Sequence, residues 1–206
     1  QQGHSYGFTN WETLTDYIFS KGVKVLSVYA FSTENFTRSK VEVDYLMNLF
    51  SVAFKKYFER QHKNNVKIVF SGRREPLPRK VLNVIDEITE ATKNNTGAIF
   101  NVCVNYGGRC EIVDTTKKIC KQVLDGLISI DDIDEELFGK NLYNDLPPID
   151  LMIRTSGEQR LSNFLLWQNS YAEFYFPEVE FPDFDAKEFD MALEEFNKRN
   201  RRFGGQ

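Results

Sequence analysis

The chain has 206 residues, of which 41% are hydrophobic and 14% aromatic, so it can bury a sizeable core, and we expect one domain that spans residues 1–206. The formal net charge of −4 and the absence of any block of lysines or arginines argue against a nucleic-acid-binding protein and a polybasic membrane anchor. No apolar run approaches the roughly 20 residues needed to cross a bilayer, and we expect a soluble protein.

The first predicted elements are a helix, a strand and a second, long helix. The chain begins at Gln1 and, by its pattern, inside an element, so we expect a segment ahead of it. Apolar residues recur at helical spacing until Lys21-Gly22, and residues 23–30 have the continuous apolar centre of a strand. A polar loop with exposed aromatic side chains is predicted over 31–38.

Ser39 and Glu42 then form a capping-box pattern, which starts a long helix that runs through Phe58. One face of this helix is strongly apolar. Such a face usually belongs to a protein core, and the alternative is that it lines a ligand channel.

Two further strands are predicted over 66–72 and 98–105, on either side of a helix from Pro78 to Lys93. The second strand ends at the glycine pair of Asn105-Tyr-Gly-Gly-Arg109. Adjacent glycines permit another group to approach the backbone closely, although the segment lacks the GxGxxG and GxxxxGK[ST] spacings and predicts no nucleotide-binding fold. A tight turn is the plainer interpretation. Helices over 109–126 and 131–140 follow.

Residues 149–176 carry the strongest chemical signal. A short apolar strand, 151–153, leads into Arg154-Thr-Ser-Gly-Glu-Gln-Arg160-Leu-Ser162, which we interpret as a strand-to-helix connection. Two guanidinium groups, three hydroxyls and the N-terminus of a following helix would together bind an anion such as phosphate. A surface salt-bridge cluster is the alternative. Glu173 lies inside an apolar and aromatic run, where a carboxylate is either paired or holds a metal ion.

Apolar strands that alternate with helices predict a single α/β domain with a mainly parallel central sheet flanked by helices. Its three cysteines have no close CxxC spacing, which indicates free thiols in a reducing compartment, the cytoplasm. Only His4 and His62 are present, which excludes a multi-histidine metal centre. A metal would need oxygen ligands, and this favours Mg²⁺.

Five segments, in order and nearly from end to end, resemble the cis-prenyltransferase family, and the bacterial undecaprenyl diphosphate synthases are the nearest match. They are Gly3-His4-Ser5-Tyr6-Gly7, Tyr29-Ala-Phe-Ser-Thr-Glu-Asn35, Asn105-Tyr-Gly-Gly-Arg109, Arg154 to Gln168, and Arg201-Arg-Phe-Gly-Gly205. The resemblance implies sequential condensation of isopentenyl diphosphate onto an allylic diphosphate, usually farnesyl diphosphate. The product would be a long cis-polyprenyl diphosphate such as undecaprenyl diphosphate, a lipid carrier for cell-wall glycan synthesis.

The resemblance also implies Mg²⁺, an apolar product tunnel, a homodimer and transient contact with membrane lipid for product release, which would make the protein cytoplasmic and peripheral at the membrane. Ala98 matches the tunnel floor, and residues 164–176 are an expected dimer interface. The terminal Arg202-Phe203-Gly204 resembles a motif that reaches a diphosphate site across the dimer.

The resemblance assigns a role to ten residues. Arg154, Arg160 and Ser162 match the residues that bind isopentenyl diphosphate, and Glu173 matches the carboxylate that binds Mg²⁺. His4 matches a residue near the departing diphosphate, and Asn35 and Arg38 match the mobile catalytic loop, in which Asn35 would be catalytic. Phe31, Ser32 and Phe36 match residues of the substrate site. The family's catalytic aspartate, in an Asp-Gly-Asn-Gly-Arg-Trp segment, would precede Gln1. Phe36 replaces the usual Trp and Ser39 a common Pro.

Two other functions are alternatives. One is a non-catalytic accessory subunit of a cis-prenyltransferase complex, which only the lack of the aspartate segment favours. The other is a phosphate-ester hydrolase or anion-binding module that uses the same arginine loop.

Overall fold

The computed structural model describes the backbone of residues 2–203, and the side chains of residues 11–52 and 54–203 among them. Two compact units make up the chain. Unit 1 comprises residues 1–23, 147–162 and 168–206, and unit 2 comprises residues 24–146 and 163–167. The expectation of one domain over 1–206 stays a prediction.

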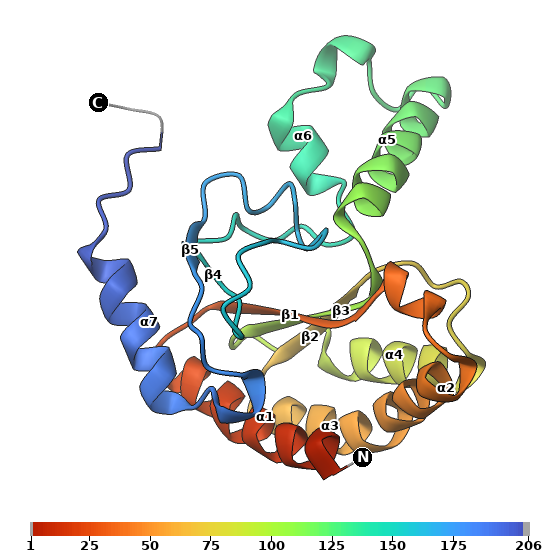
Figure 1. The fold of residues 1–206 in the computed structure, drawn as a ribbon. Helices are drawn as coiled ribbons and strands as arrows, with labels where there is room; N and C mark the ends of the chain where they lie inside the picture. Colours follow the sequence, from red (N-terminus) through yellow and green to blue (C-terminus); the bar gives the residue numbers. More distant parts are fainter. Residues whose placement is uncertain (1, 204–206) are drawn as a thin grey trace. The chain divides into compact units, whose positions relative to one another are not determined.

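Unit 2 is built on a three-stranded parallel sheet in the order β1-β3-β2 (Figure 1). The strands are β1 (Val25–Ser32), β2 (Lys67–Ser71) and β3 (Ile99–Tyr106). The central strand β3 is buried from its second residue to its last. This arrangement confirms the predicted parallel sheet, with strand ends displaced by one or two residues from the sequence prediction.

One face of this sheet is covered by the long helix and by α4 (Arg79–Thr92), as Figure 1 shows. The long helix consists of α2 (Lys40–Leu49), a π-helical segment η2 (Phe50–Phe54) and α3 (Lys55–Lys63). The Ser39 hydroxyl accepts a hydrogen bond from the Glu42 amide, as the capping pattern predicts. Phe58 is fully buried, and its ring packs 5.5 Å from Phe70 of β2. The apolar face is therefore core over this part of the helix.

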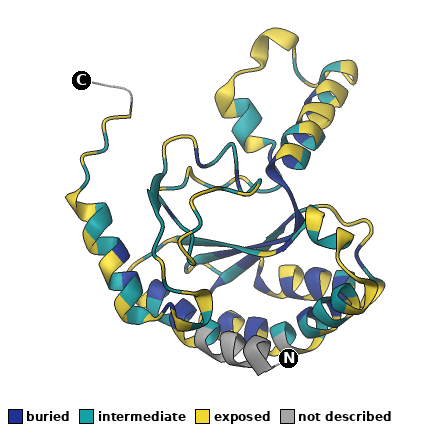
Figure 2. Cartoon of the chain, in the orientation of Figure 1, coloured by how far each residue is buried: buried dark blue, intermediate teal, exposed yellow. Residues whose placement is uncertain are grey.

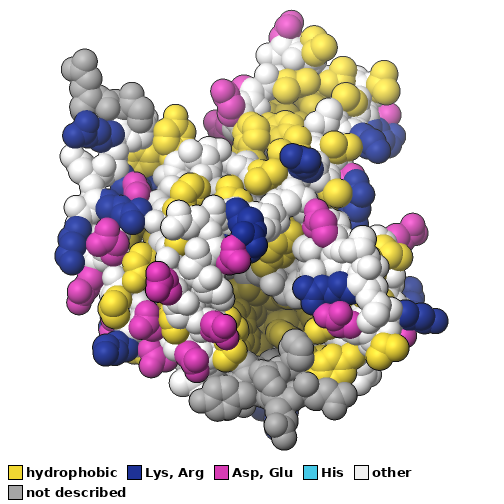
Figure 3. All heavy atoms as spheres, in the orientation of Figure 1, with side chains coloured by type: hydrophobic (Ala, Val, Ile, Leu, Met, Phe, Trp, Pro, Cys, Tyr) yellow, Lys and Arg dark blue, Asp and Glu magenta, His cyan; other side chains and the backbone are white. Residues whose placement is uncertain are grey.

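A helical hairpin follows β3 in unit 2. It contains α5 (Gly108–Leu124), the short 3-10 helix η3 (Ile130–Asp132) and α6 (Glu135–Lys140). Figures 2 and 3 show that much of the hairpin is exposed and that apolar side chains gather on its visible face. Leu124, Leu127 and Ile130 are at least 70% exposed.

Unit 1 pairs helices from the two ends of the described chain. The Tyr17 hydroxyl of α1 (Gln2–Ser20) donates to Asp190 of α7 (Ala186–Lys198) at 2.6 Å, and Lys21 pairs with the same carboxylate at 2.9 Å. The Trp11 ring lies 5.9 Å from that of Phe181, in the 3-10 helix η4 (Phe181–Asp183). The Asp185 side chain accepts a hydrogen bond from the Glu188 amide, so the predicted cap of the last helix is present.

The remaining strands of unit 1, β4 (Leu151–Ile153) and β5 (Glu173–Tyr175), form a separate two-stranded parallel sheet. The prediction of a helix directly after Arg154 to Ser162 is wrong, because the described chain has only turns and loops between β4 and β5. Ser162, Asn163 and Leu165 have φ values of 47°, 66° and 44°, which a right-handed helix does not allow.

The loop predicted over 31–38 contains the last residues of β1 and a 3-10 helix, η1 (Thr33–Thr37). Within the described residues, no helix combines the length and apolar character that a membrane crossing requires.

Candidate functional site

The predicted anion-binding loop in unit 1 is closed on itself by Arg154. One nitrogen of its guanidinium group, Nη1, donates to the carbonyl oxygen of Arg160 and to the hydroxyl of Ser162, each at 2.7 Å. The backbone amide of Gly157, within the loop, donates to the carbonyl oxygen of Pro177 at 2.9 Å and fixes the loop backbone there. The structure therefore brings together the three residues predicted to bind isopentenyl diphosphate.

Arg160 points its charge toward solvent. Its side chain is 60% exposed and forms an ion pair with Glu158. The loop thus holds a salt bridge, and it also presents guanidinium and hydroxyl groups at its surface, so the anion-binding interpretation stays a prediction. An anionic ligand would compete with Glu158 for Arg160, and such an exposed pair costs little to break.

Glu173 is paired, which is one of the two states expected for it. Its Oε2 accepts a hydrogen bond from Nη1 of Arg199 at 2.9 Å, and the same nitrogen donates to the carbonyl of Phe174 at 2.9 Å. Both side chains are about one third exposed, at 27% for Glu173 and 31% for Arg199. Oε1 makes no hydrogen bond within the described part of the chain, so Glu173 retains one oxygen for a further ligand.

The residues present fit a Mg²⁺ ion only as part of its coordination. Among the described residues, no group of three or more His, Cys, Asp or Glu side chains could hold a metal on its own. Mg²⁺ is commonly bound through one or two carboxylates together with substrate phosphates and water. Glu173 can supply one such carboxylate, and a diphosphate substrate would supply further oxygens.

The segment after α7 is tied to the small sheet by a second arginine. Arg201 forms an ion pair with Asp150, which directly precedes β4, and donates to the carbonyl of Tyr171 at 3.4 Å. Its guanidinium lies 4.5 Å from the centre of the Phe203 ring. Of the predicted terminal motif, Phe203 is exposed and Gly204 lies outside the described residues.

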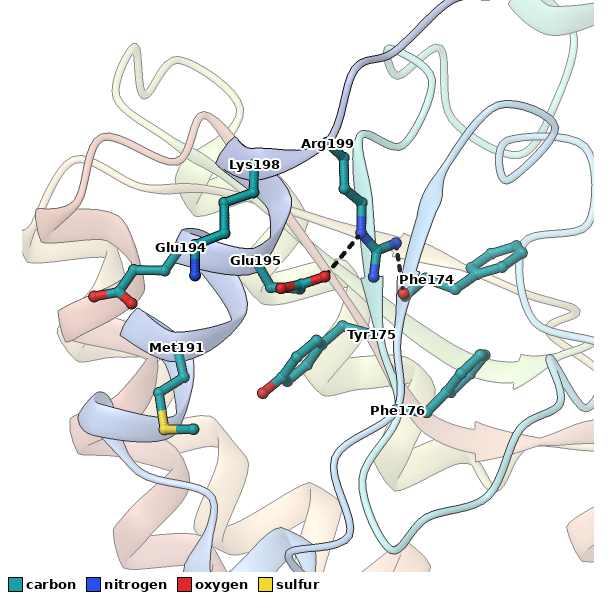
Figure 4. Close-up of a pocket in the computed structure, with 8 residues that line it drawn as sticks. All are labelled: Phe174, Tyr175, Phe176, Met191, Glu194, Glu195, Lys198 and Arg199. Carbon is teal, nitrogen blue, oxygen red and sulfur yellow. Dashed lines mark hydrogen bonds and ion pairs between the residues drawn. The ribbon is translucent and has the colours of Figure 1, made fainter.

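A cavity of about 420 Å³ lies beside the Glu173 pair, between β5 and α7 (Figure 4). Its walls combine aromatic side chains with acidic and basic groups: Phe174, Tyr175, Phe176, Met191, Glu194, Glu195, Lys198 and Arg199. Figure 4 shows Arg199 at the end of α7, between Glu195 and the carbonyl of Phe174.

Apart from His4, the remaining predicted residues lie in unit 2, at the carboxyl end of β1. Phe31 is buried, and the ring of Phe36 meets it edge to face at 4.9 Å, so phenylalanine keeps an apolar contact at this position. The Asn35 side chain accepts a hydrogen bond from the amide of Ser32 at 2.9 Å. Arg38 pairs with Glu42 at 2.5 Å. The side chain of His4 lies outside the described residues.

Asn163 connects this turn to the glycine pair, a role that sequence reasoning missed. Its side chain donates to Glu34 at 2.9 Å and accepts from the amide of Arg109 at 2.9 Å, and its carbonyl accepts from Gly108 at 2.7 Å. A Cβ atom at Gly107 would lie 2.7 Å from the Asn163 amide nitrogen. The glycines thus permit the close approach that the sequence predicted.

Glu34, which accepts the hydrogen bond from Asn163, has a pKa below its ordinary value. Burial raises the pKa of Glu34, but hydrogen bonds from a backbone amide and from Asn163 outweigh burial and leave the pKa below its ordinary value.

A buried network supports the β3–α5 junction. The Tyr106 hydroxyl donates to Glu111 at 2.5 Å, and Glu111 also accepts from the Tyr143 amide at 3.1 Å. Burial, followed by the Glu111 charge, raises the pKa of Tyr106. At the surface of this network, Arg73 forms two 2.8 Å bonds with Asp114, which lower the pKa of that carboxyl group.

Comparison with known proteins extends over nearly the whole chain. A family model described as "Putative undecaprenyl diphosphate synthase" matches residues 1–204. The isoprenyl transferase of Streptococcus mutans is 48% identical over 98% of this chain and 84% of its own length. The Pyrococcus abyssi tritrans,polycis-undecaprenyl-diphosphate synthase (geranylgeranyl-diphosphate specific) is 44% identical over 98% of this chain and 78% of its own length.

Solved structures agree. Lavandulyl diphosphate synthase from Lavandula x intermedia, in complex with dimethylallyl diphosphate, superposes with a TM-score of 0.94 at 36% identity, covering 99% of this chain and 89% of that one. An undecaprenyl diphosphate synthase from Campylobacter jejuni, described as probable, gives a TM-score of 0.86 at 36% identity, over 97% and 92%. The sequence, its fold and these relatives together establish that the chain belongs to the undecaprenyl diphosphate synthase family of cis-prenyltransferases and is a prenyl transferase.

Proposed function

We propose that this prenyl transferase condenses isopentenyl diphosphate sequentially onto farnesyl diphosphate. The product would be a long cis-polyprenyl diphosphate such as undecaprenyl diphosphate, for use as the lipid carrier of cell-wall glycan synthesis. The observation that carries the proposal is the closed loop in which Arg154 holds the Arg160 backbone and the Ser162 hydroxyl in one place.

This loop suits a diphosphate because its donors are preorganised. Arg154 is already oriented by two hydrogen bonds, so little ordering is left to occur on binding. Arg160 carries the exposed guanidinium, which can form charge-assisted bonds to phosphate oxygens after it leaves Glu158. We assign the isopentenyl diphosphate to Arg154, Arg160 and Ser162.

The reaction places charge demands on the other proposed residues. Negative charge develops on the departing allylic diphosphate, and bound Mg²⁺, with Glu173 as its protein ligand, would supply positive charge to it. We assign Phe31, Ser32 and Phe36 to the border of the allylic site, His4 to the departing diphosphate, and Asn35 with Arg38 to the catalytic loop. The chemistry needs no covalent nucleophile.

The starter is tested directly, because the relatives differ in it. One is named for geranylgeranyl diphosphate, and a solved neighbour holds dimethylallyl diphosphate. The full-length natural protein is incubated with radiolabelled isopentenyl diphosphate, Mg²⁺ and each of the dimethylallyl, farnesyl and geranylgeranyl starters. Butanol-extractable label, resolved by chain length, reports starter preference and product together.

Farnesyl diphosphate is expected to give the highest kcat/KM, and chelation of the metal is expected to abolish incorporation. No incorporation by a folded, full-length protein would contradict the proposal, and release of phosphate without isopentenyl diphosphate would indicate a hydrolase. Arg160→Ala is expected to lower this incorporation. Arg79→Ala is its matched control and should not lower it, because Arg79 is an exposed arginine of α4 outside the proposed site. The accessory-subunit alternative gains no support, since the relatives are named as transferases and synthases.

We also propose that the protein is a homodimer that contacts membrane lipid when it releases product. Each added isoprene unit buries more apolar chain, at about 0.8 kcal/mol per CH₂, so product release should become slow. Detergent is therefore expected to raise steady-state turnover, and an unchanged rate would count against slow release. Light scattering measures whether the protein in solution has twice the mass of the chain.

A further inference from the structure

Arg199 stands between two carboxylates, and it holds one of them more closely. Its Nη1 lies 2.9 Å from Oε2 of Glu173, whereas its Nε lies 3.6 Å from Oε1 of Glu195. Glu195 is one turn earlier on α7, so this second pair has the i,i+4 spacing of helix neighbours. Figure 4 shows the guanidinium turned toward both Glu195 and the carbonyl of Phe174.

We propose that Arg199 is a positioning residue, which neutralises and orients Glu173 until a divalent cation binds there, and that Glu195 receives Arg199 when the cation displaces it. The inference rests on the proposed function, because it takes Glu173 as the Mg²⁺ ligand.

Arg199 occupies only Oε2 of Glu173, and it is the repulsion between its charge and that of a cation on Oε1 that favours such an exchange. A partly buried carboxylate without a partner is unfavourable, and Arg199 supplies the partner while no metal is bound. A divalent cation on the same carboxylate would lie beside the guanidinium, and the two like charges would repel each other. The binding free energy of the metal therefore includes the loss of the Arg199–Glu173 pair.

The local geometry allows Arg199 to move. It is the C-cap residue of α7, with an extended backbone at φ −82° and ψ 140°, so its side chain leaves the helix where no further turn confines it. The cavity of about 420 Å³ has both Glu195 and Arg199 in its wall, which leaves space for the side chain to shift. A cation at a helix C-terminus is favoured by the helix dipole, so Arg199 keeps this stabilisation when it moves closer to Glu195.

The two partners of Arg199 should affect metal affinity in opposite directions. Arg199→Gln removes the competitor, and we expect the metal to bind about two to five times more tightly, in the range of one partly exposed ion pair. Glu195→Gln removes the receiving carboxylate, and we expect binding about two to five times weaker. Arg199→Lys retains the charge and should return the affinity toward that of the natural protein.

The experiment measures Mn²⁺ binding to the full-length protein in the presence of inorganic diphosphate, by the relaxation rate of water protons. This readout is independent of turnover. Arg79→Gln is the matched control, because it removes an exposed arginine of α4 outside the proposed site, and it should leave the affinity unchanged. Glu173→Gln should abolish the Mn²⁺ site. Thermal unfolding is recorded for each variant, and Arg199→Lys with Glu195→Gln carries the test if Arg199→Gln does not fold.

Opposite shifts for the Arg199 and Glu195 variants would support the inference. Weaker or unchanged Mn²⁺ binding by Arg199→Gln would overturn it, since Arg199 would then bind the diphosphate itself or have no influence on Glu173. Undiminished Mn²⁺ binding by Glu173→Gln would also overturn it, by removing the metal from Glu173. Isopentenyl diphosphate incorporation, measured separately on the natural protein, shows whether the proposed function stands in either case.

Discussion

Replacing Asn163 with aspartate tests whether its side chain joins Glu34 of η1 to the glycine pair Gly107-Gly108. The Asn163→Asp change keeps the shape and the oxygen that accepts from the Arg109 amide, but it puts an oxygen where the Nδ2 group donates to Glu34 at 2.9 Å. The lost hydrogen bond is worth about 1 kcal/mol at this partly exposed site. Two carboxylates about 3 Å apart add roughly 1.4 kcal/mol of repulsion even at the dielectric constant of water.

The charge on the new aspartate strengthens its bond with the Arg109 amide by about 0.5 kcal/mol, so we expect a net loss of about 2 kcal/mol in the free energy of unfolding. Urea unfolding at pH 7 measures it. The double variant Glu34→Gln/Asn163→Asp restores a donor opposite the new carboxylate and should recover at least about half of the loss, as a coupling free energy in a double-mutant cycle.

Asn94→Asp, the same change at an exposed turn residue, is the control and should alter stability by less than about 0.5 kcal/mol. The penalty at Asn163 should also shrink as the pH falls, because two adjacent carboxylates raise the pKa of one of them, which then takes up a proton. An Asn163→Asp variant as stable as the natural protein, or a cycle without coupling, would refute the network.

Three further predictions concern the site, the backbone and acid stability. Arg160→Ala should lower kcat/KM for isopentenyl diphosphate by at least about thirtyfold, because a guanidinium partner of a bound diphosphate contributes roughly 2 kcal/mol or more. Its stability in urea should stay nearly unchanged. Normal kinetics would show that Arg160 does not belong to the site. Gly72→Ala should lower the free energy of unfolding by about 2–5 kcal/mol, because φ is +139° and a Cβ atom would meet a carbonyl oxygen of β3 at 1.9 Å. Gly22→Ala, at φ +85° with open space around it, should lower it by only about 1 kcal/mol. Thermal unfolding of both variants measures the difference. Arg73 lowers the pKa of Asp114 in the folded state, so the pair stabilises the folded protein above the unfolded pKa of about 4, and this contribution is lost as the pH falls through the lowered folded pKa. The Arg73→Ala variant should therefore lose less stability than the natural protein between pH 5 and pH 2. Parallel stability profiles over this pH range would contradict the prediction.

Local sequence signals predicted the elements of this fold well. Ser39 and Asp185 cap helices in the structure as their spacing to Glu42 and Glu188 predicts, because a cap depends only on residues three apart. The helix expected after Ser162 is absent for a tertiary reason. Asn163 adopts a left-handed backbone and gives its carbonyl and side chain to the β3–α5 junction and to Glu34, contacts that span 54 to 129 positions of sequence.

The same limit applies to the site. The residue types of Arg154, Arg160 and Ser162 predict anion binding from the sequence alone, and the structure brings the three residues together. The partner of Glu173 is not visible, because Arg199 lies 26 positions away and meets it only after β5 and α7 have packed. Nothing in a local window distinguishes Arg199 from the other arginines near the C-terminus.

The pairing of α1 with α7 has a consequence for synthesis on the ribosome. Tyr17 and Asp190 are 173 positions apart, and a ribosome that adds about 5–20 residues per second needs on the order of 10–30 s to span them. During that time the Tyr17 ring lacks the ring of Phe189 in α7, which it meets at 6.5 Å in the folded protein. The nascent α1 is thus a stretch that a chaperone is expected to shield until α7 emerges.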